Sequence, residues 1–439
     1  MEVTVEETGA LERVITVRVG AEKINQMLDL ELQNLSSRVK LPGFRPGKTP
    51  RKHLETRFKD HLAQAVMERL AQDGMNKIRK DLGLRLAGEP EFRFEQPIHR
   101  DQDLVFTLTV QIMPEVQAEG YQGMTLNRPT VEVTDDDVNA ALEQVRVHHA
   151  QFEPAEKEAA TGDQLVLNFK GYVDDEPFQG GEAEGYVLEL GSGRFIPGFE
   201  DQLIGIKTGE ERDVKVTFPE AYAAPHLAGK EALFRCSVSE IRCRVLPEIN
   251  DELATKAGIQ EGGLEKLQES LRENLTRRVQ AEIKKRLQRQ IHDTLIAANT
   301  FELPSKIVER EVNAMMEQFK EDSRERGYNP SDHGLNDAML ADSFRDTANR
   351  RVRLGLLIAA IAKQENLEVD DAKVDARIET LAATYGAQAR EFKQWARADE
   401  NRMDGIRGGV LEEMVNDWIL EKAAITDETI ALDALLVEG

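Results

Sequence analysis

The periodicity of apolar residues changes along the chain, and this change limits the folds that the chain can adopt. Residues 155–246 alternate between apolar and polar side chains and carry glycine clusters, as in strands joined by turns. From Leu246 onward apolar residues recur at helical spacing, and the run 264–296 continues for over thirty residues. Because helices of globular domains are usually shorter, this run predicts projecting helical arms. With 439 residues, the chain is expected to form two to four domains.

Residues 1–112 mix the two patterns and predict an α+β domain. Alternating stretches on either side of Gly9, and others at 91–95 and 103–112, predict the strands of a small antiparallel sheet. Helical spacing predicts one helix from residue 21 to 40 and a second, unbroken helix from about 51 to 81. The segment between these helices is rich in Pro and Gly, and we expect it to form an exposed tip.

Positive charge is concentrated around this tip, although the whole chain has a formal charge of −23. Residues 1–112 contain 18 Lys and Arg against 17 Asp and Glu, so the negative charge lies in the remainder. Eight basic residues and one acid, Glu55, lie between Arg38 and Lys59. A solvated basic face would explain this cluster, but a block of like charge more often marks an interaction. We therefore expect the cluster to bind a polyanion.

The rest of the chain divides where the pattern changes. Residues 113–154 are expected to be a linker that belongs structurally with the C-terminal region, with a helix that starts after the N-cap Thr134. Residues 155–246 predict a mostly antiparallel β domain with one short helix near 197–205. Residues 247–439 predict an all-α domain, with helices at 264–296, 305–322, 337–366, 369–386, 389–403 and 406–423.

The sequence offers no residue pattern for metal, nucleotide or thiol chemistry, and we expect no cofactor. The eight His do not fall at a metal-ligand spacing, and adjacent His148 and His149 cannot share one helical face. Cys236 and Cys243 lie seven residues apart on an expected strand and should face opposite sides, so they predict neither a disulfide nor a metal pair. The first residues lack a signal-peptide pattern, and the longest apolar run, 354–362, is too short to span a bilayer. A cytoplasmic protein without a membrane partner is therefore expected.

The β domain resembles the FKBP-type peptidyl-prolyl isomerases through about ninety residues. Its most specific stretch is GRFIPGFEDQLIGIKTGE, and VLNFKGYVDDEPFQGG precedes it. The resemblance implies an aromatic-lined bowl between the sheet and a short helix. Carried over by motif, the pocket residues are Phe169, Phe178, Tyr186, Phe195, Ile196, Phe199, Tyr222 and Phe234. Phe169 and Phe234 could equally belong partly to the core, and Gln179 stands where the family often has an acid, which bears on ligand binding and proline-neighbour preference.

Such a pocket needs no acid, base or cofactor to act on an X–Pro bond. Rotation about that bond faces a barrier of roughly 18–20 kcal/mol, because the twisted amide loses its resonance. The twisted amide is less polar than the planar one, so an apolar pocket that excludes water and fits the twisted form lowers the barrier. The resemblance therefore implies isomerisation by shape and desolvation.

The basic tip has a resemblance of its own. GFRPGKTP (43–50) is similar to the signature of the trigger factor family of bacterial ribosome-associated chaperones, and the order of domains matches that family along the entire chain. The resemblance implies docking beside the exit of the large ribosomal subunit, on ribosomal protein and RNA. The residues it assigns to docking are Gly43, Phe44, Arg45, Gly47 and Lys48. Arg45 can fork onto a carboxylate or phosphate and Phe44 offers an apolar anchor, whereas Pro46 stands where the family often has Lys.

The same resemblance gives the C-terminal helices a role in binding nascent and unfolded polypeptides. Most residues of their apolar stripes are expected in the core, and an exposed minority would bind unfolded chains. The candidates are Met315, Met316, Phe319, Leu354, Leu356, Leu357, Ile358 and Ile361. The resemblance allows a homodimer when the protein is off the ribosome. Two alternatives stay open: a free-standing prolyl isomerase, and a non-enzymatic adaptor that reuses the isomerase fold.

Overall fold

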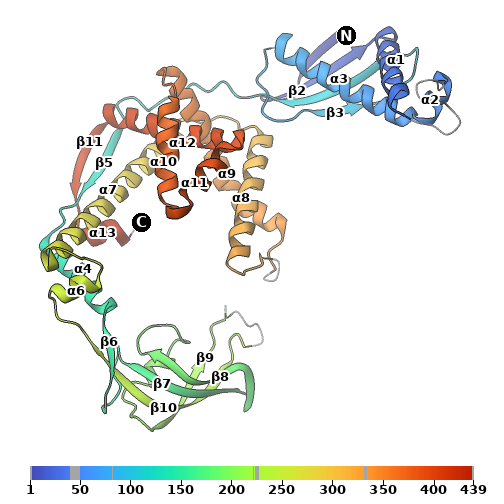
Figure 1. Ribbon diagram of the computed structural model, residues 1–439. Helices are drawn as coiled ribbons and strands as arrows, with labels where there is room; N and C mark the ends of the chain where they lie inside the picture. The colour runs from blue at the N-terminus through green and yellow to red at the C-terminus, as the bar shows by residue number, and fades with distance from the viewer. Residues whose placement is uncertain are drawn as a thin grey trace. The chain divides into compact units, whose positions relative to one another are not determined.

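The computed structural model describes residues 2–39, 50–81, 83–220, 222, 227–330 and 334–437 (Figure 1). The chain forms two compact units. One unit combines Met1–Arg128 with Arg286–Thr426, and the other combines Pro129–Lys285 with Asp427–Gly439. The multidomain α+β architecture expected from the change of periodicity is confirmed.

The N-terminal part of the first unit is a four-stranded antiparallel sheet with helices on one face (Figure 1). Its strands, in the spatial order β1-β2-β4-β3, are β1 (Glu2–Glu7), β2 (Glu12–Val19), β3 (Glu91–Phe94) and β4 (Leu104–Gln111). Its helices are α1 (Ala21–Arg38), α2 (Arg51–Arg57) and α3 (Lys59–Asp81). Alternate residues of β2 and β4, such as Ile15 and Phe106, are fully buried beneath α1 and α3, as period-two spacing requires.

The expectation of one unbroken helix from 51 to 81 is wrong, because the helix is interrupted at Phe58. The backbone of Phe58 has φ −119° and ψ 25°, and its N–H closes α2 on the carbonyl of Leu54. The Phe58 ring packs on a small cluster, separate from the main core, that includes Leu54 and Leu62. Tertiary packing of this ring overrides the helical spacing, which continues through the break without a Pro or Gly.

The β domain is a five-stranded antiparallel sheet with one short helix. Its elements are β6 (Gln151–Pro154), β7 (Gln164–Val173), β8 (Glu176–Glu189), α5 (Phe199–Gln202), β9 (Glu211–Thr217) and β10 (Glu231–Val245). The strand order is β6-β10-β7-β8, and β9 also pairs with β10. β6, which precedes the expected start of this domain at residue 155, therefore joins the same sheet. The inner face of the sheet and α5 enclose one core, with Leu165, Phe199 and Leu203 completely buried.

The C-terminal region is helical. Its helices are α6 (Asp251–Lys256), α7 (Gly263–Ala298), α8 (Ser305–Glu325), α9 (Asp337–Gln364), α10 (Asp371–Ala383), α11 (Ala389–Arg397) and α12 (Glu400–Lys422). α7 has 36 residues, which confirms the long helix expected there. The expected break near 404–405 is wrong: α12 begins after Asp399, whose carboxylate accepts a hydrogen bond from the Arg402 N–H and caps the helix.

A strand and a short helix after α12 were not expected. β11 (Ala424–Thr429) pairs with β5 (Thr125–Thr130), and α13 (Leu432–Val437) follows. The helix expected after Thr134 is α4 (Asp135–His148), and Thr134 and Asp137 cap it reciprocally. The segment before β5 is also bound to C-terminal helices, because the Tyr121 hydroxyl donates to Glu365 at 2.7 Å.

Candidate active site

Aromatic side chains surround a hollow of about 370 Å³ in the β domain. β7 contributes Phe169, β8 contributes Phe178, and β10 contributes Phe234, each from the inner face of the sheet. The loop between β8 and α5 supplies Phe195 and Ile196. The full lining is Phe169, Phe178, Gly180, Gly181, Arg194, Phe195, Ile196, Pro197, Phe218, Pro219, Tyr222 and Phe234.

Six of the eight residues assigned by motif line this hollow: Phe169, Phe178, Phe195, Ile196, Tyr222 and Phe234. The other two contact the lining without belonging to it. Phe199 is completely buried, and its ring centroid lies 4.6 Å from that of Phe195. Tyr186 is 39% exposed and meets the rings of Phe169 and Phe195 edge-on. The motif residues therefore form one cluster of contacting side chains, in which Phe199 is buried behind the residues that line the hollow.

Edge-to-face contacts fix the orientation of the rings. Phe169 meets Tyr186, Phe195, Phe199 and Phe234 at centroid distances of 5.6–6.3 Å. Each such contact is worth about 0.5–1.5 kcal/mol beyond simple burial. Phe234 is 4% exposed and Phe169 is half-buried, so both rings pack on the core and also line the hollow. The walls are thus arranged before any ligand binds.

Sequence reasoning missed residues that place Phe178. The Phe178 ring meets Phe218 edge-on at 5.8 Å, and Phe218 packs on Tyr222 at 4.6 Å. A Cβ at Gly171 or at Gly181 would lie 2.6 Å from atoms of the Phe178 ring. The absence of a side chain at these two positions is therefore what admits the ring. A glycine inside a strand is the available signal for such a close approach.

The hollow offers shape and low polarity rather than acid–base chemistry. Among the described residues of the lining, Arg194, which is exposed, and Tyr222 are the ionisable side chains. Cys236 is buried in the same core cluster as Phe234. Burial, with the charge of Asp213, raises the pKa of its thiol to about 12, so this thiol is unreactive. In the part of the chain that the structure describes, no group of three or more His, Cys, Asp or Glu could hold a metal ion.

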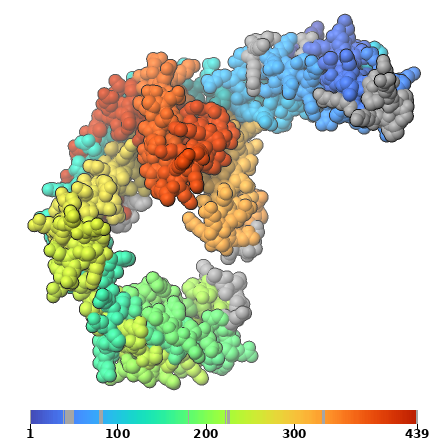
Figure 2. All heavy atoms as spheres, viewed as in Figure 1, coloured from blue at the N-terminus to red at the C-terminus, as the bar shows by residue number. Residues whose placement is uncertain are grey.

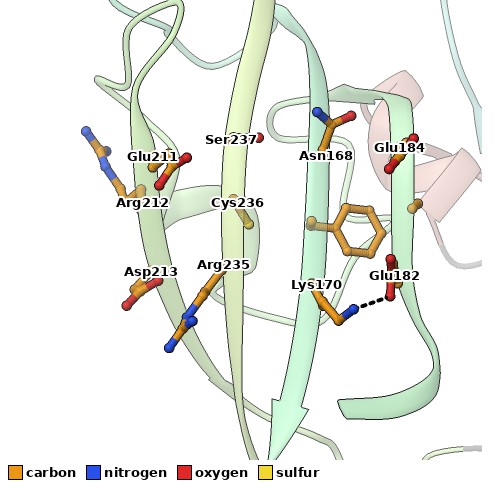
Figure 3. Close-up of a pocket in the computed structure, with 12 residues that line it drawn as sticks. Asn168, Lys170, Glu182, Glu184, Glu211, Arg212, Asp213, Arg235, Cys236 and Ser237 are labelled. Atoms are coloured by element: carbon orange, nitrogen blue, oxygen red, sulfur yellow. Dashed lines mark ion pairs between the residues drawn. The ribbon is translucent and has the colours of Figure 1, made fainter.

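The opposite face of the same sheet has a second hollow, of about 690 Å³, with a different character (Figure 3). Charged side chains from four strands surround it, and Lys170 on β7 forms an ion pair with Glu182 on β8 at 2.8 Å. Glu211 and Asp213 on β9 and Arg235 on β10 add further charge. Such a surface does not desolvate an apolar ring, so the smaller aromatic hollow is the candidate active site.

The C-terminal helices carry an exposed group of rings, here called the aromatic surface (Tyr385, Phe392, Trp395 and Arg402). Tyr385 and Trp395 are 52% and 53% exposed. Tyr385 stacks on Phe392 at 4.6 Å, Phe392 lies 5.7 Å from Trp395, and the Arg402 guanidinium lies 4.1 Å from the Trp395 ring centroid. Atoms of α10–α12, coloured orange to red, lie at the surface in Figure 2.

The expectation that some of the eight apolar candidates on α8 and α9 are exposed is wrong. Met316, Leu357, Ile358 and Ile361 are buried. The remaining four, Met315, Phe319, Leu354 and Leu356, are half-buried. Most of them pack α8 against α9, so these stripes stabilise the helices rather than face solvent.

The residues assigned to ribosome docking, Gly43, Phe44, Arg45, Gly47 and Lys48, and the unusual Pro46 lie outside the described residues. The helices on either side of them are described and are tied together. One Arg100 nitrogen donates to Asp29 on α1 at 3.0 Å and to Glu55 on α2 at 2.6 Å. Arg100 thus links α1 to α2, the helices that precede and follow residues 40–49 in the sequence.

Three family models match the chain in the same order as its structural parts. The model described as bacterial trigger factor protein matches residues 1–145, and the model of its C-terminus matches 263–421. Between them, the model of FKBP-type peptidyl-prolyl cis-trans isomerase matches residues 155–239, which contain the aromatic hollow.

Similar proteins match over their whole length. The trigger factor of Magnetococcus marinus is 40% identical over 441 residues, with 100% of both chains covered. That of Ectopseudomonas mendocina is 38% identical over 433 residues, covering 99% of this chain and 97% of the relative. A solved structure of the trigger factor chaperone is 24% identical with a TM-score of 0.51, and the match covers 96% of this chain and 100% of that one.

Proposed function

The chain belongs to the trigger factor family, and on this premise we propose which of its surfaces perform each part of the function. It is a ribosome-associated chaperone that carries an FKBP-type peptidyl-prolyl isomerase domain. Three surfaces divide the work: the aromatic hollow isomerises X–Pro bonds, the aromatic surface binds unfolded polypeptides, and the basic tip docks on the ribosome.

The isomerase site is the hollow walled by Phe169, Phe178, Phe195, Ile196 and Phe234. The observation that carries this assignment is that pre-oriented rings enclose it and that, among the described residues, its lining contains no carboxylate, His, Lys or Cys side chain. Its volume, about 370 Å³, suits a proline side chain and the adjoining amide. Because the twisted amide is less polar than the planar one, these walls stabilise the twisted form.

A protease-coupled assay on an X–Pro peptide tests the isomerase activity directly. We expect a rate above the uncatalysed one that is independent of added metal and nucleotide. A rate equal to background would leave the non-enzymatic adaptor as the better account.

The aromatic surface supports a role in binding unfolded chains. The Tyr385 and Trp395 side chains are more than half exposed, and aromatic rings lose little conformational entropy when they bind. Arg402, stacked on Trp395, adds a cation beside the rings that can donate hydrogen bonds to backbone carbonyls or carboxylates of a client. Such a surface binds apolar segments of many sequences.

The basic tip is proposed to dock beside the exit of the large ribosomal subunit, in contact with ribosomal protein and RNA. Support comes from the concentration of basic residues around 38–59 and from the family membership of the chain. Arg100 contributes indirectly by joining α1 and α2, the helices on either side of these residues in the sequence. If RNA phosphates dominate the contact, affinity falls steeply with salt.

Cosedimentation with empty ribosomes at low and high salt tests this docking. The variant Phe44→Ala/Arg45→Ala/Lys48→Ala should remain in the supernatant. A matched control with the same three residue types, Phe392→Ala/Arg390→Ala/Lys393→Ala on α11, should pellet like wild type. If both variants pellet with ribosomes to the same extent as wild type, a free-standing isomerase is the better account.

We further propose a cytoplasmic protein that works without a cofactor and forms a homodimer when it is off the ribosome. Within the described ranges, no helix has the length and apolar character needed to cross a membrane. Ribosome docking places the protein where nascent chains emerge. Sedimentation velocity over a range of concentrations, with and without ribosomes, measures the homodimer.

A further inference from the structure

The loop between β8 and α5 carries two walls of the aromatic hollow without regular secondary structure of its own. Phe195 and Ile196 project from it into the hollow. A loop lacks the repeated hydrogen bonds of a strand or helix, so its backbone N–H groups must find other partners. The position of these two walls therefore depends on what those N–H groups bind.

One carboxylate binds several donors of this loop. The Glu200 side chain lies in the first turn of α5 and is 8% exposed. Its Oε1 accepts hydrogen bonds from the Ser192 hydroxyl at 3.1 Å and from the Phe195 N–H at 3.2 Å. Its Oε2 accepts from the Gly193 N–H at 3.2 Å. The Ser192 hydroxyl in turn accepts from the Arg194 N–H at 3.4 Å.

The helix that bears Glu200 is itself fixed to the sheet. The Gln202 amide nitrogen donates to the Lys215 carbonyl at 2.8 Å, and its oxygen accepts from the Lys215 N–H at 3.2 Å. Phe199, next to Glu200, is completely buried in the core. A continuous path of hydrogen bonds therefore joins β9, α5, the Glu200 carboxylate and the backbone of Phe195.

The hydrogen bonds favour the ionised form of Glu200. Burial alone would raise its pKa, but the bonds from Gly193, Phe195, Ser192 and Gly191 outweigh burial and hold the pKa below its usual value. All of these partners donate to the carboxylate. In a protonated carboxyl, the O–H group would face one of these donors, and that hydrogen bond would be lost. Among the described residues, Glu200 has hydrogen-bond donors around it and no ion-pair partner.

We propose that Glu200 is a positioning residue for isomerisation, whose ionised carboxylate holds the 191–196 loop so that Phe195 and Ile196 face the bound proline. This inference rests on the aromatic hollow being the isomerase site. Without the carboxylate, the loop samples other conformations, and only the fraction of molecules with the loop in place binds substrate. A reduced competent fraction raises the apparent dissociation constant in proportion and leaves the bound complex unchanged.

The test compares Glu200→Gln with wild type in the full chain, using the X–Pro peptide assay over a range of substrate concentrations. Glutamine has the same shape, but its amide nitrogen would face a hydrogen-bond donor instead of accepting from it. We expect KM to rise by about tenfold while kcat stays within about twofold of wild type. An unchanged KM, or a fall in kcat at constant KM, would overturn the proposal.

Two further variants separate positioning from a general loss of structure. Asp201→Asn removes the same charge from the next residue, which is exposed, and should leave both constants unchanged. Ser192→Ala removes one of the hydrogen bonds that the Glu200 carboxylate accepts and should raise KM by about twofold to threefold. If Asp201→Asn raises KM as much as Glu200→Gln does, net charge and not loop positioning is responsible.

A spectroscopic readout does not depend on turnover. An amide proton bound to a carboxylate resonates downfield, so the Gly193 and Phe195 amide protons should move upfield in Glu200→Gln while core amides of β7 and β10 stay in place. Unmoved Gly193 and Phe195 signals would overturn the proposal. If wild type itself lacks isomerase activity, the assigned function fails, whereas the amide shifts still report whether Glu200 orders the loop.

Discussion

The β domain and the C-terminal helices both present aromatic side chains, but in opposite ways. In the β domain the rings line a hollow of about 370 Å³ and several of them also belong to the core. In the α10–α12 region, Tyr385 and Trp395 are more than half exposed. A concave site of fixed rings selects one shape, whereas exposed rings accept many. The two regions thus suit a specific reaction and a general affinity for unfolded chains.

The two groups of rings are also held differently. Phe178 fits over Gly171 and Gly181 with no room for another carbon, and its neighbours are buried strands. The helices around Trp395 are joined by surface ion pairs, such as Lys393 with Glu379 and Arg397 with Asp375 at 2.7 Å. Surface pairs contribute only about 0–1 kcal/mol each, so they permit adjustment to different clients. The side chains that line the hollow are therefore held rigidly, whereas the exposed rings can adjust to different clients.

The largest expected effect comes from filling the space under Phe178. Gly171→Ala places a Cβ 2.6 Å from the Phe178 ring and 2.7 Å from the Phe234 ring, so the rings must shift. Overpacking of this kind costs about 1–3 kcal/mol, and we expect kcat/KM for an X–Pro peptide to fall by roughly tenfold or more. The peptide assay measures this below the unfolding midpoint of the variant.

The control for this substitution is Gly355→Ala. Gly355 lies within α9, and a Cβ there would meet no atom within 4 Å. The change should leave kcat/KM unchanged and stabilise the helix by up to about 1 kcal/mol. Equal activity of the two variants would show that close packing of Phe178 is not needed for catalysis.

A smaller effect is expected from removing the largest exposed ring. Trp395→Ala should weaken binding of an unfolded, proline-free polypeptide by about threefold to tenfold. The substitution removes the exposed ring area that the bound polypeptide would cover. Fluorescence anisotropy of the labelled polypeptide measures this change. Isomerase kcat/KM on a short peptide should stay at the wild-type value.

Met339→Ala is the matched control, because Met339 is also 53% exposed but lies apart from any described ring contact. We expect it to change polypeptide affinity by less than about twofold. If Met339→Ala and Trp395→Ala have equal effects, exposed apolar area alone governs binding and the clustering of rings has no part in it.

The smallest effect is expected at Arg402. Its guanidinium lies 4.1 Å from the Trp395 ring centroid, and its side chain also donates to the Trp395 carbonyl at 2.8 Å. An exposed cation–π contact is worth about 0.5–1 kcal/mol, so Arg402→Gln should weaken binding of an acidic unfolded polypeptide by about twofold to fivefold. The same anisotropy experiment with a basic polypeptide should show a smaller change, and the opposite ranking would contradict a role for the cation.

Much of the β domain could be predicted because its motif is dense and local. Six of the eight motif residues line the hollow. Alternation along β7, β8 and β10 places Phe169, Phe178 and Phe234 on the inner face, and loops supply the other three. Phe218 was missed because its contact with Phe178 depends on how β9 lies beside β10, which the sequence does not display. Glu200 was missed because an acid in a first helical turn usually only stabilises the helix end.

The helical region could be predicted in its periodicity but not in its exposed surfaces. Helical spacing marks apolar stripes such as that of Met316 and Leu357, yet the same spacing describes a stripe that packs and one that is open. Trp395 and Tyr385 are exposed because no described element covers them, which is a property of tertiary arrangement. The pairing of β11 with β5 joins segments about 300 residues apart, and local pattern carries no record of such a pairing.

The most direct test of the division between the two aromatic regions is a paired measurement on Gly171→Ala. Peptide isomerase kcat/KM and the dissociation constant for an unfolded, proline-free polypeptide are measured on the same preparation. We predict that kcat/KM falls by roughly tenfold or more while the dissociation constant stays within about twofold of wild type. A parallel loss of both would contradict the account, because it would mean that the hollow and the exposed rings act as one binding surface.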